Sequence, residues 1–338
     1  MNRFFTGIVV LLSVWLFALT LKAASPEVEQ ARQHGAQGQV TFRVIDSTGR
    51  PVEKANVRAT FFESDSYGYI NFARGQTDTN GLFIASGKTI YDVTFDVKKD
   101  GFYSTEGQYQ FYRRGEDCVQ NGRWQPWNPT NTVVLKEHRN PVAMCAKEVD
   151  IRIPVRDQAI GFDLEKGDWV APHGQGTMAD LLINFTATYE GPQAFSKRIE
   201  LSVSNPRDGV QAFALDRTSE LMSLYAAPEE GYAPKLVDEQ VRTRTKILKS
   251  SEIGKGQYLV FRVRSVTNEE GGIVSANYGK IYGPNLLDPI IEYGRMRDTD
   301  RLMFTYYLNP TPNDRNLEFD PSRNLFKDLK STERVTDP

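Results

Sequence analysis

Residues 38–64 read GQVTFRVIDSTGRPVEKANVRATFFES. Apolar and polar side chains alternate on both sides of the turn sequence STGRP at 47–51, a pattern typical of strands that bury one face. We predict two short strands joined by a tight connection. The pattern returns after a second turn, DTNG at 78–81, and again in YDVTFDVKKDGFYS at 91–104. This part of the chain is therefore predicted to be all-β.

The chain beyond residue 104 divides by composition. Residues 105–147 are rich in Gly, Arg, Asn and Pro and are predicted to form a bridge. Residues 148–310 carry a second series of strand-like runs, among them ADLLINFTATYE and YLVFRVRSV, interrupted by a short predicted helix at 218–225. We expect a second, larger β-sandwich there. Residues 311–338 are predicted to be an extended tail whose apolar side chains pack back on the body.

The N-terminus has the layout of an export signal. Arg3 precedes an apolar run at residues 4–21, and the small residues Ala23, Ala24 and Ser25 follow. This layout is typical of a secretory signal peptide, but the run is long enough that residues 1–24 also fit an uncleaved membrane anchor. Both interpretations place the protein outside the cytoplasm, either secreted or in the periplasm or cell envelope. Any contact with a membrane is expected through residues 4–21 only. Beyond them, Ser25 and Pro26 are typical of a helix N-terminus and predict a short leader helix.

Several residues of the first strand series carry a family resemblance. They are Gly38-x-Val40, Val44-x-Asp46, Gly49-x-Pro51-Val52, Ala55-x-Val57, Thr77-Asp78-x-Asn80-Gly81-x-Phe83, Tyr91-x-Val93 and Gly101-Phe102-Tyr103. Over about residues 37–104 the chain resembles the carboxypeptidase regulatory-like module. The resemblance implies a prealbumin-like β-sandwich that serves as a scaffold or adhesion accessory. The remainder is similar only in style to exported bacterial proteins.

Composition and charge exclude one class of partner. The chain has 338 residues, with 41 Lys and Arg against 43 Asp and Glu, and a formal charge of −2 at pH 7. This length allows about two domains. A nucleic-acid-binding protein is expected to have a high pI and clustered basic residues. The pI here is about 6.1 and the charges are scattered, so we expect no nucleic-acid partner.

The sequence holds no complete motif for a cofactor or a metal. None of the three histidines, His34, His138 and His173, has a glutamate three residues later, which the zinc ligand pair of a carboxypeptidase requires. Gly174-x-Gly176-x-x-Ala179 matches a dinucleotide motif in letters only, because strand-like sequence follows it where the motif needs a helix. P-loop and nucleophile-elbow motifs are absent from the sequence. We therefore predict no cofactor and no metal site.

Cys118 and Cys145 are the only cysteines. In an oxidising compartment an even count favours a disulfide bond, and closing a loop of this length stabilises by roughly 3.6 kcal/mol in the chain-entropy model. We predict a Cys118–Cys145 bridge. The alternative is two unrelated thiols, with Cys145 acting as a small apolar residue in a packed segment.

Three side chains are candidates for ligand binding. Trp124 and Trp127 lie in a polar segment bounded by Gly and Pro, and exposed aromatic rings on a β-scaffold are suited to stacking on sugar rings. The alternative is that both pack at the junction between the two sandwiches. His173 is the best single candidate for a functional imidazole, although a polar loop residue explains it as well.

These observations favour an exported or envelope-anchored, non-catalytic binding or scaffold protein. Its ligand is not identified by the sequence, and a cell-envelope polysaccharide or a protein both fit. The alternative from another class is a secreted carbohydrate-active enzyme or other hydrolase. It would use paired carboxylates in one cleft of the second sandwich. A third hypothesis is a structural envelope protein that self-associates through sheet edges.

Overall fold

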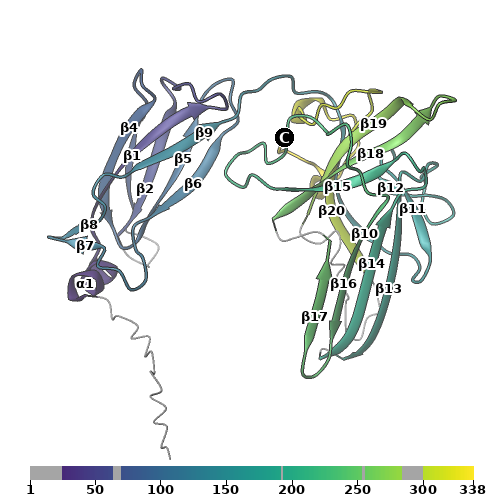
Figure 1. The fold of residues 1–338 in the computed structure, drawn as a ribbon, viewed down its shortest axis with the longest axis horizontal. Coiled ribbons are helices and arrows are strands. Elements are labelled where there is room, and N and C mark those ends of the chain that lie inside the picture. Colours follow the sequence, from purple (N-terminus) through teal and green to yellow (C-terminus); the bar gives the residue numbers. More distant parts are fainter. Residues whose placement is uncertain (1–24, 64–69, 192, 253–255, 284–299) are drawn as a thin grey trace, which may run out of the picture.

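The computed structural model describes residues 25–63, 70–191, 193–252, 256–283 and 300–338. Two β-sandwiches lie side by side, the first coloured purple to blue and the second teal to yellow (Figure 1). The predicted all-β class with two sandwiches is confirmed. The predicted signal or anchor at residues 1–24 lies outside the described residues. None of the described helices is long and apolar enough to cross a membrane.

The predicted leader helix is present as α1 (Pro26–His34). The Oγ of Ser25 accepts a hydrogen bond from the backbone N–H of Val28 at 3.4 Å, and Pro26 occupies the first helical turn. Both features stabilise a helix N-terminus. Val28 and Ala31 are buried in the core of the first sandwich, so α1 covers one end of that sandwich.

The first sandwich consists of two sheets. One sheet has the order β4 (Leu82–Thr89), β1 (Ala36–Asp46), β8 (Arg123–Trp124) and β7 (Val119–Gln120), with β9 (Thr130–Leu135) also paired to β1. The other has the order β3 (Ile70–Gln76), β2 (Asn56–Phe62), β5 (Asp92–Lys98) and β6 (Thr105–Gln110). Phe42 of the first sheet meets Phe95 of the second across the core, with ring centroids 4.9 Å apart.

The two predicted strands are present as β1 and β2, with a turn after Asp46, but they do not pair with each other. β1 pairs with β4, β8 and β9, whereas β2 pairs with β3 and β5, so the turn at 47–51 carries the chain from one sheet to the other. The same holds for the turn at 78–81, which joins β3 to β4. Gly81 has φ +73° and its carbonyl accepts a hydrogen bond from Val44 of β1, which ties that turn to the sheet edge.

The first sandwich extends beyond the predicted boundary at residue 104. Strands β6 to β9 come from the segment interpreted as a bridge, yet they complete both sheets of the first sandwich. β9 runs parallel to β1, with Thr41 opposite Thr130 and Asp46 opposite Leu135. The connection between the two sandwiches is therefore shorter, from residue 136 to residue 144.

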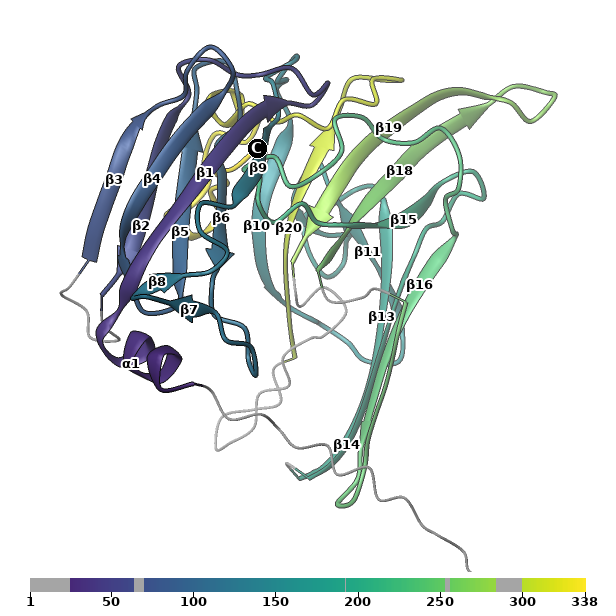
Figure 2. The same ribbon diagram turned by 60° about the vertical axis from the view of Figure 1, so that its left-hand side comes forward.

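The second sandwich is larger. One sheet has the order β10 (Cys145–Arg152), β20 (Arg301–Asn309), β19 (Ile273–Tyr282), β18 (Gln257–Thr267) and β15 (Gly209–Ala214). The other has the order β12 (Asp168–Trp169), β11 (Ala159–Asp163), β13 (Leu181–Gly191), β14 (Ala194–Ser202), β16 (Lys235–Arg242) and β17 (Ile247–Ser251). Phe162 and Phe304 meet across the core at 5.5 Å. β13, β14 and β16 extend below the body as a long arm (Figure 2).

The C-terminal tail packs back on the second sandwich, as predicted. Leu317 and Phe319 are buried with aromatic residues of β18, β19 and β20 on the outer face of their sheet. Two short 3-10 helices follow, η1 (Pro321–Arg323) and η2 (Ser331–Glu333). Leu325, in contrast, is 41% exposed. The sheet therefore has a second apolar layer outside the main core.

The predicted helix at 218–225 does not form. Its backbone donors bond to other elements, because the N–H of Glu220 donates to the carbonyl of Ser104 and the N–H of Leu224 donates to the Tyr258 hydroxyl. Ser219 forms an isolated β-bridge with Thr105 of the first sandwich. This segment therefore joins the two sandwiches.

A buried carboxylate completes the junction. Glu318 is 2% exposed. Its Oε1 accepts hydrogen bonds from the Tyr103 hydroxyl at 3.1 Å and from the Arg139 N–H at 2.9 Å, and its Oε2 accepts one from the Asn140 N–H at 3.1 Å. Burial and the nearby Glu318 carboxylate raise the pKa of Tyr103, which keeps the phenol a donor. Glu318 in the tail thus fixes residues 103 and 139–140 at one point.

We expect Glu318→Ala to weaken this junction. The substitution leaves the buried Tyr103 hydroxyl and two part-buried backbone N–H groups without their acceptor, at a cost of about 2 kcal/mol in the free energy of unfolding. Urea denaturation measures the loss, and small-angle scattering measures whether the two sandwiches change their relative position. Glu318→Gln, which keeps one acceptor oxygen, is expected to show a smaller loss. Unchanged scattering and stability in Glu318→Ala would contradict this role.

Candidate ligand-binding groove

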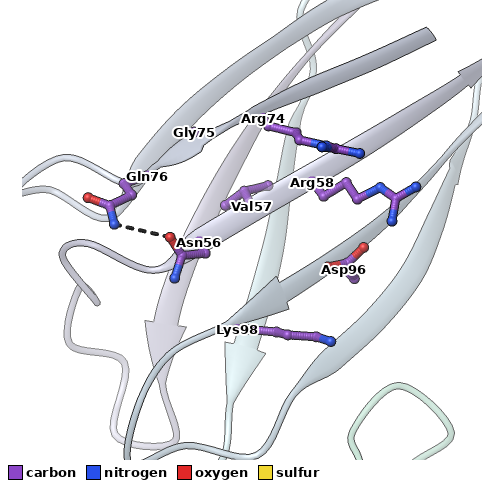
Figure 3. Close-up of a pocket in the computed structure, with 8 residues that line it drawn as sticks. All are labelled: Asn56, Val57, Arg58, Arg74, Gly75, Gln76, Asp96 and Lys98. Atoms are coloured by element: carbon purple, nitrogen blue, oxygen red, sulfur yellow. Dashed lines mark hydrogen bonds between the residues drawn. The ribbon is translucent and has the colours of Figure 1, made fainter.

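A groove of about 370 Å³ opens on the outer face of the first sandwich. It lies on the sheet formed by β3, β2 and β5 (Figure 3). The residues that line it are Asn56, Val57, Arg58, Arg74, Gly75, Gln76, Asp96 and Lys98. Its volume falls within the usual range of small-molecule and sugar-sized sites.

Strand register places the polar lining residues in two rows. Arg58 of β2 lies directly opposite Arg74 of β3 on one side and Asp96 of β5 on the other. Asn56, two residues earlier, has Gln76 and Lys98 as its partners in the same way. Side chains two residues apart on a strand share one face. All six side chains therefore project from the same face, opposite to the core.

The groove's charges are not neutralised by one another. Within the part of the chain that the structure describes, Arg58, Arg74 and Lys98 take part in no ion pair, although Asp96 is adjacent to Arg58. The Gln76 amide donates to the Asn56 side-chain oxygen at 3.0 Å, and the Gln76 oxygen points away from the other lining residues (Figure 3). This leaves the Asn56 amino group as a donor and the Asp96 carboxylate as an acceptor in the groove. The face therefore offers both donors and acceptors to a ligand.

An exposed aromatic ring borders the two arginines. Phe72 of β3 is 40% exposed. The guanidinium carbon of Arg58 lies 4.4 Å from the centroid of this ring, and that of Arg74 lies 4.9 Å from it. Contacts of this kind are favourable and restrict the side chains. Phe72 thereby holds both guanidinium groups at the end of the groove.

The two tryptophans predicted to stack on sugars lie in different surroundings. Trp124 is fully buried in the core of the first sandwich, where it stacks on Phe111 and donates its indole N–H to the Thr89 carbonyl at 2.7 Å. Its ring is therefore closed to a ligand in this structure, and it lies in that core rather than at the junction. Trp127 is 37% exposed, with the Arg123 guanidinium 4.8 Å from its ring centroid. The pair makes no common platform.

His173 lies in an exposed loop of the second sandwich, after β12. Its backbone N–H donates to the Val170 carbonyl at 3.1 Å, as expected for a polar turn residue. Among the described residues, no group of three or more His, Cys, Asp or Glu side chains has the arrangement of a metal site. The structure does not bring His173 near the tryptophans or the groove.

The predicted Cys118–Cys145 disulfide is wrong. Both thiols are free and buried. Cys118 belongs to the core of the first sandwich and Cys145 to the core of the second. Burial raises the pKa of Cys145 to about 11, which disfavours the reactive thiolate. Each cysteine behaves as a small apolar core residue.

The second sandwich does contain a close pair of carboxylates, but both are engaged by one arginine. Arg264 donates from Nε and Nη2 to the two oxygens of Asp180 at 2.7 and 2.9 Å, and from Nη2 to Asp163 at 3.4 Å. The carboxylate oxygens also accept backbone hydrogen bonds from Leu164, Glu165, Lys166, Thr177 and Met178. Every oxygen of the pair has a protein partner.

Electrostatics agree with a structural role for this cluster. Burial opposes the charge of Asp163, yet its backbone donors hold the pKa of that carboxyl below the ordinary value. Burial likewise opposes the charge of Arg264, but hydrogen bonds and charge from Asp180 raise the pKa of the guanidinium. A catalytic acid needs a raised pKa and access to substrate. Asp163 has neither.

The second sandwich also buries a lysine. Lys280 of β19 is fully buried, and its Nζ donates to the Ser223 hydroxyl at 3.0 Å. The amine lies 4.7 Å from the ring centroid of Tyr307 and 5.2 Å from that of Tyr282. Burial lowers the pKa of Lys280 well below the usual value, although Glu318 raises it. Ser223 belongs to the segment that contacts the first sandwich.

Comparison with known proteins identifies no relative. No family model and no curated protein matches the sequence. Similar solved structures include 3-chlorocatechol 1,2-dioxygenase from Rhodococcus opacus, at 13% identity, 31% of this chain, 62% of that chain and a TM-score of 0.25. Two others are major pilins. They are SpaD from Corynebacterium diphtheriae (10%, 85% and 84%, 0.23) and BcpA from Bacillus cereus (9%, 81% and 85%, 0.22).

These similarities are too weak to carry an argument. All three identities are below 25% and all three TM-scores are below 0.5. The match also spans less than two thirds of the dioxygenase chain. The class of the protein therefore rests on its own strands and their register, which form two β-sandwiches in series.

Proposed function

We propose that the protein is an exported or envelope-anchored, non-catalytic binding and scaffold protein whose ligand is a carbohydrate. The groove on the β3–β2–β5 face carries this proposal. It is an open, sugar-sized concavity whose amide and charged side chains are oriented by register and left free for a ligand. The secretory layout of residues 1–24 supports export. The resemblance of residues 37–104 to carboxypeptidase regulatory-like modules supports an accessory role.

The carboxylate chemistry of the second sandwich supports a non-catalytic role. A glycosidase of the usual kind needs two carboxyl groups that flank a substrate bond. Asp163 and Asp180 are instead 1% and 3% exposed and share Arg264. Neither carboxylate is placed to flank a substrate bond, as the hydrolase alternative requires.

The junction supports the scaffold role. Glu318, the Thr105–Ser219 bridge and the ion pair between Lys136 and Asp216 at 2.9 Å connect the two sandwiches at separate points. A contact made at several points resists rotation better than a single linker. The second sandwich would therefore present the groove of the first in a fixed orientation.

The proposal is tested by depletion of the purified protein on insoluble peptidoglycan, chitin, cellulose and starch, and by binding to soluble glycans. We expect binding to at least one polysaccharide, and a loss of about tenfold in Asn56→Ala/Gln76→Ala, because this change removes the Asn56 donor and the Gln76 side chain that orients it. Gln37→Ala/Gln39→Ala on β1 is the matched control, since it removes two amides from the outer face of the opposite sheet. Binding to no glycan would overturn the proposal.

A further inference from the structure

The charges of the groove identify a narrower class of ligand. Three cations, Arg58, Arg74 and Lys98, line it together with one carboxylate, Asp96. The whole chain, in contrast, has a formal charge of −2. The groove therefore carries a local excess of positive charge, although the chain as a whole is slightly negative. The question is which ligand would use it.

Arg58 and Arg74 are direct cross-strand neighbours. Like charges directly opposite each other on neighbouring strands destabilise a sheet. The contacts with the Phe72 ring hold both arginines in place but leave their charges unneutralised, whereas a bound anion would neutralise them. The carboxylate nearest to Arg58 is Asp96, opposite it on β5, and the two side chains form no ion pair. The arginine pair is therefore arranged for an anion that comes from outside the chain.

The same two guanidinium groups are held in advance of binding. Both rest on the Phe72 ring, at 4.4 and 4.9 Å from its centroid. A guanidinium presents a planar fork of donors that matches a carboxylate or a sulfate in two hydrogen bonds. Because Phe72 restricts the arginines, less side-chain entropy is lost when an anion binds.

The second row of the groove, formed by Gln76, Asn56 and Lys98, is suited to binding hydroxyl groups and a further anion. Lys98 lies one row from the arginine pair, about 6.6 Å away along the strand direction at 3.3 Å per residue. Asn56 lies between Lys98 and Gln76 and has an amino group that donates, and the Asp96 carboxylate in the neighbouring row accepts. A chain that carries hydroxyl groups and repeated acidic groups satisfies both rows.

We propose that the groove binds an acidic polysaccharide, one whose sugars carry carboxylate or sulfate groups. This inference rests on the proposed carbohydrate-binding function and names the ligand class. Nucleic acid fits less well. Asp96 lies within the groove and needs a hydrogen-bond donor, and the backbone of duplex DNA has no free hydroxyl group that could supply one. Sugar hydroxyl groups, in contrast, use Asp96 as an acceptor.

The test measures affinity for soluble polygalacturonate and dextran sulfate, with uncharged dextran and starch as neutral probes and double-stranded DNA as the competing polyanion. We expect the purified protein to bind at least one acidic glycan more tightly than the neutral ones, and to bind it less tightly as salt rises. Arg58→Gln/Arg74→Gln is expected to weaken that binding by about 10- to 100-fold. Arg43→Gln/Lys88→Gln, which removes two charges from the opposite sheet, is expected to change it by less than about twofold.

The outcomes separate this inference from the function on which it rests. Equal binding of neutral and acidic glycans, unchanged by the arginine double variant, would overturn the acidic class and leave carbohydrate binding standing. Binding to none of the glycans would overturn both. DNA binding at least as tight as that of the acidic glycans, lost in the arginine variant, would overturn the polysaccharide class. Circular dichroism of each variant checks that the sheet still folds.

Discussion

Arg264→Met is expected to lower the free energy of unfolding at pH 7 by about 3–5 kcal/mol, because it leaves two buried carboxylates without their cation. Asp163 and Asp180 both lie against the guanidinium, and neither has solvent to replace it. Arg264 has φ +58° and lies at a register shift in β18. This positive φ is unfavourable for Met and for Arg alike, so the substitution adds no backbone strain of its own. The loss therefore reports on the side chain. Urea denaturation at constant ionic strength measures it.

The pH dependence of the loss has a definite sign. In the wild-type protein the pKa of Asp163 is lowered, so its contribution is present at neutral pH and is lost as pH falls through the folded-state value. Burial raises the pKa of Asp180, so its contribution has the opposite sign and offsets that of Asp163. In Arg264→Met the two carboxyl groups face each other in a buried site, which raises their folded-state pKa values. The folded variant then binds more protons than the unfolded chain, so its stability rises as pH falls from 7 towards 5. The gap between the two proteins is expected to narrow over that range.

A second substitution isolates the charge. Asp180→Asn in the Arg264→Met background removes one of the two stranded charges, and we expect it to recover part of the lost stability. In the wild-type background Asp180→Asn removes half of a satisfied ion pair and is expected to destabilise. A deficit below about 1 kcal/mol in Arg264→Met, or one that stays constant between pH 7 and pH 5, would contradict the structural role of this cluster.

Local pattern predicts the faces of the strands in this protein, but it does not predict which strands are neighbours. The alternation in residues 38–64 indicates that Val40, Phe42 and Val44 face a core, and all three are fully buried. Their partner β9 begins at Thr130, and no feature of residues 38–64 points to it. Pairing depends on the packing of two whole sheets. For the same reason the sequence places the boundary of the first sandwich too early.

The candidate groove shows the same limit at the level of a site. Arg58, Arg74 and Lys98 occupy alternate outward positions on three different strands, and each one alone is an ordinary solvated residue. Only the register of β2 with β3 and β5 collects them into one concavity. A signal was present in the sequence, because a strand pattern already assigns these residues to the solvent face. What the sequence lacks is the pairing that makes them neighbours.

Composition misleads most where a polar segment is folded into a core. Trp124 lies among Gly, Asn and Pro residues that are typical of an exposed loop. The two-residue strand β8 nevertheless pairs with β1, and the indole N–H finds the Thr89 carbonyl inside the sandwich. Cys118 and Cys145 likewise form an even pair in number, yet the core of a different sandwich surrounds each. Tertiary packing decides all three positions.

Lys280→Met is expected to flatten the alkaline pH dependence of stability. Burial lowers the pKa of Lys280 in the folded state, whereas an unfolded lysine titrates near 10.4. Between these two values the unfolded chain binds one more proton than the folded protein, so wild-type stability rises with pH. One proton contributes at most about 1.4 kcal/mol per pH unit, or about 2.7 kcal/mol from pH 7 to pH 9. The free energy of unfolding of Lys280→Met is expected to lack this increase with pH.

The groups around the Lys280 amine determine the pH range in which its effect on stability can be measured. The amine faces Ser223, Tyr282 and Tyr307, with Glu318 and Lys136 as the nearest charges that affect it. Burial raises the pKa values of the two tyrosines, so their ionisation opposes folding only as pH approaches that of free tyrosine, near 10. Urea denaturation is therefore compared from pH 7 to pH 9. In that range Lys280→Met leaves the Ser223 hydroxyl with one partner fewer, a cost that does not depend on pH.

Lys88→Met provides the control, because it removes a half-exposed lysine from the first sandwich. Its stability is expected to run parallel to wild type over the same pH range, while the difference between wild type and Lys280→Met grows with pH. If the stability of Lys280→Met instead ran parallel to wild type, the pKa of Lys280 would not be lowered in the folded protein, and the prediction would be wrong. Ser223 accepts a hydrogen bond from this amine, and the charge of Glu318 acts on it. The same two residues also connect the 219–225 segment and the tail to residues 136 and 103. The buried amine of Lys280 therefore lies next to the junction that orients the groove, and its hydrogen bond to Ser223 is part of that junction.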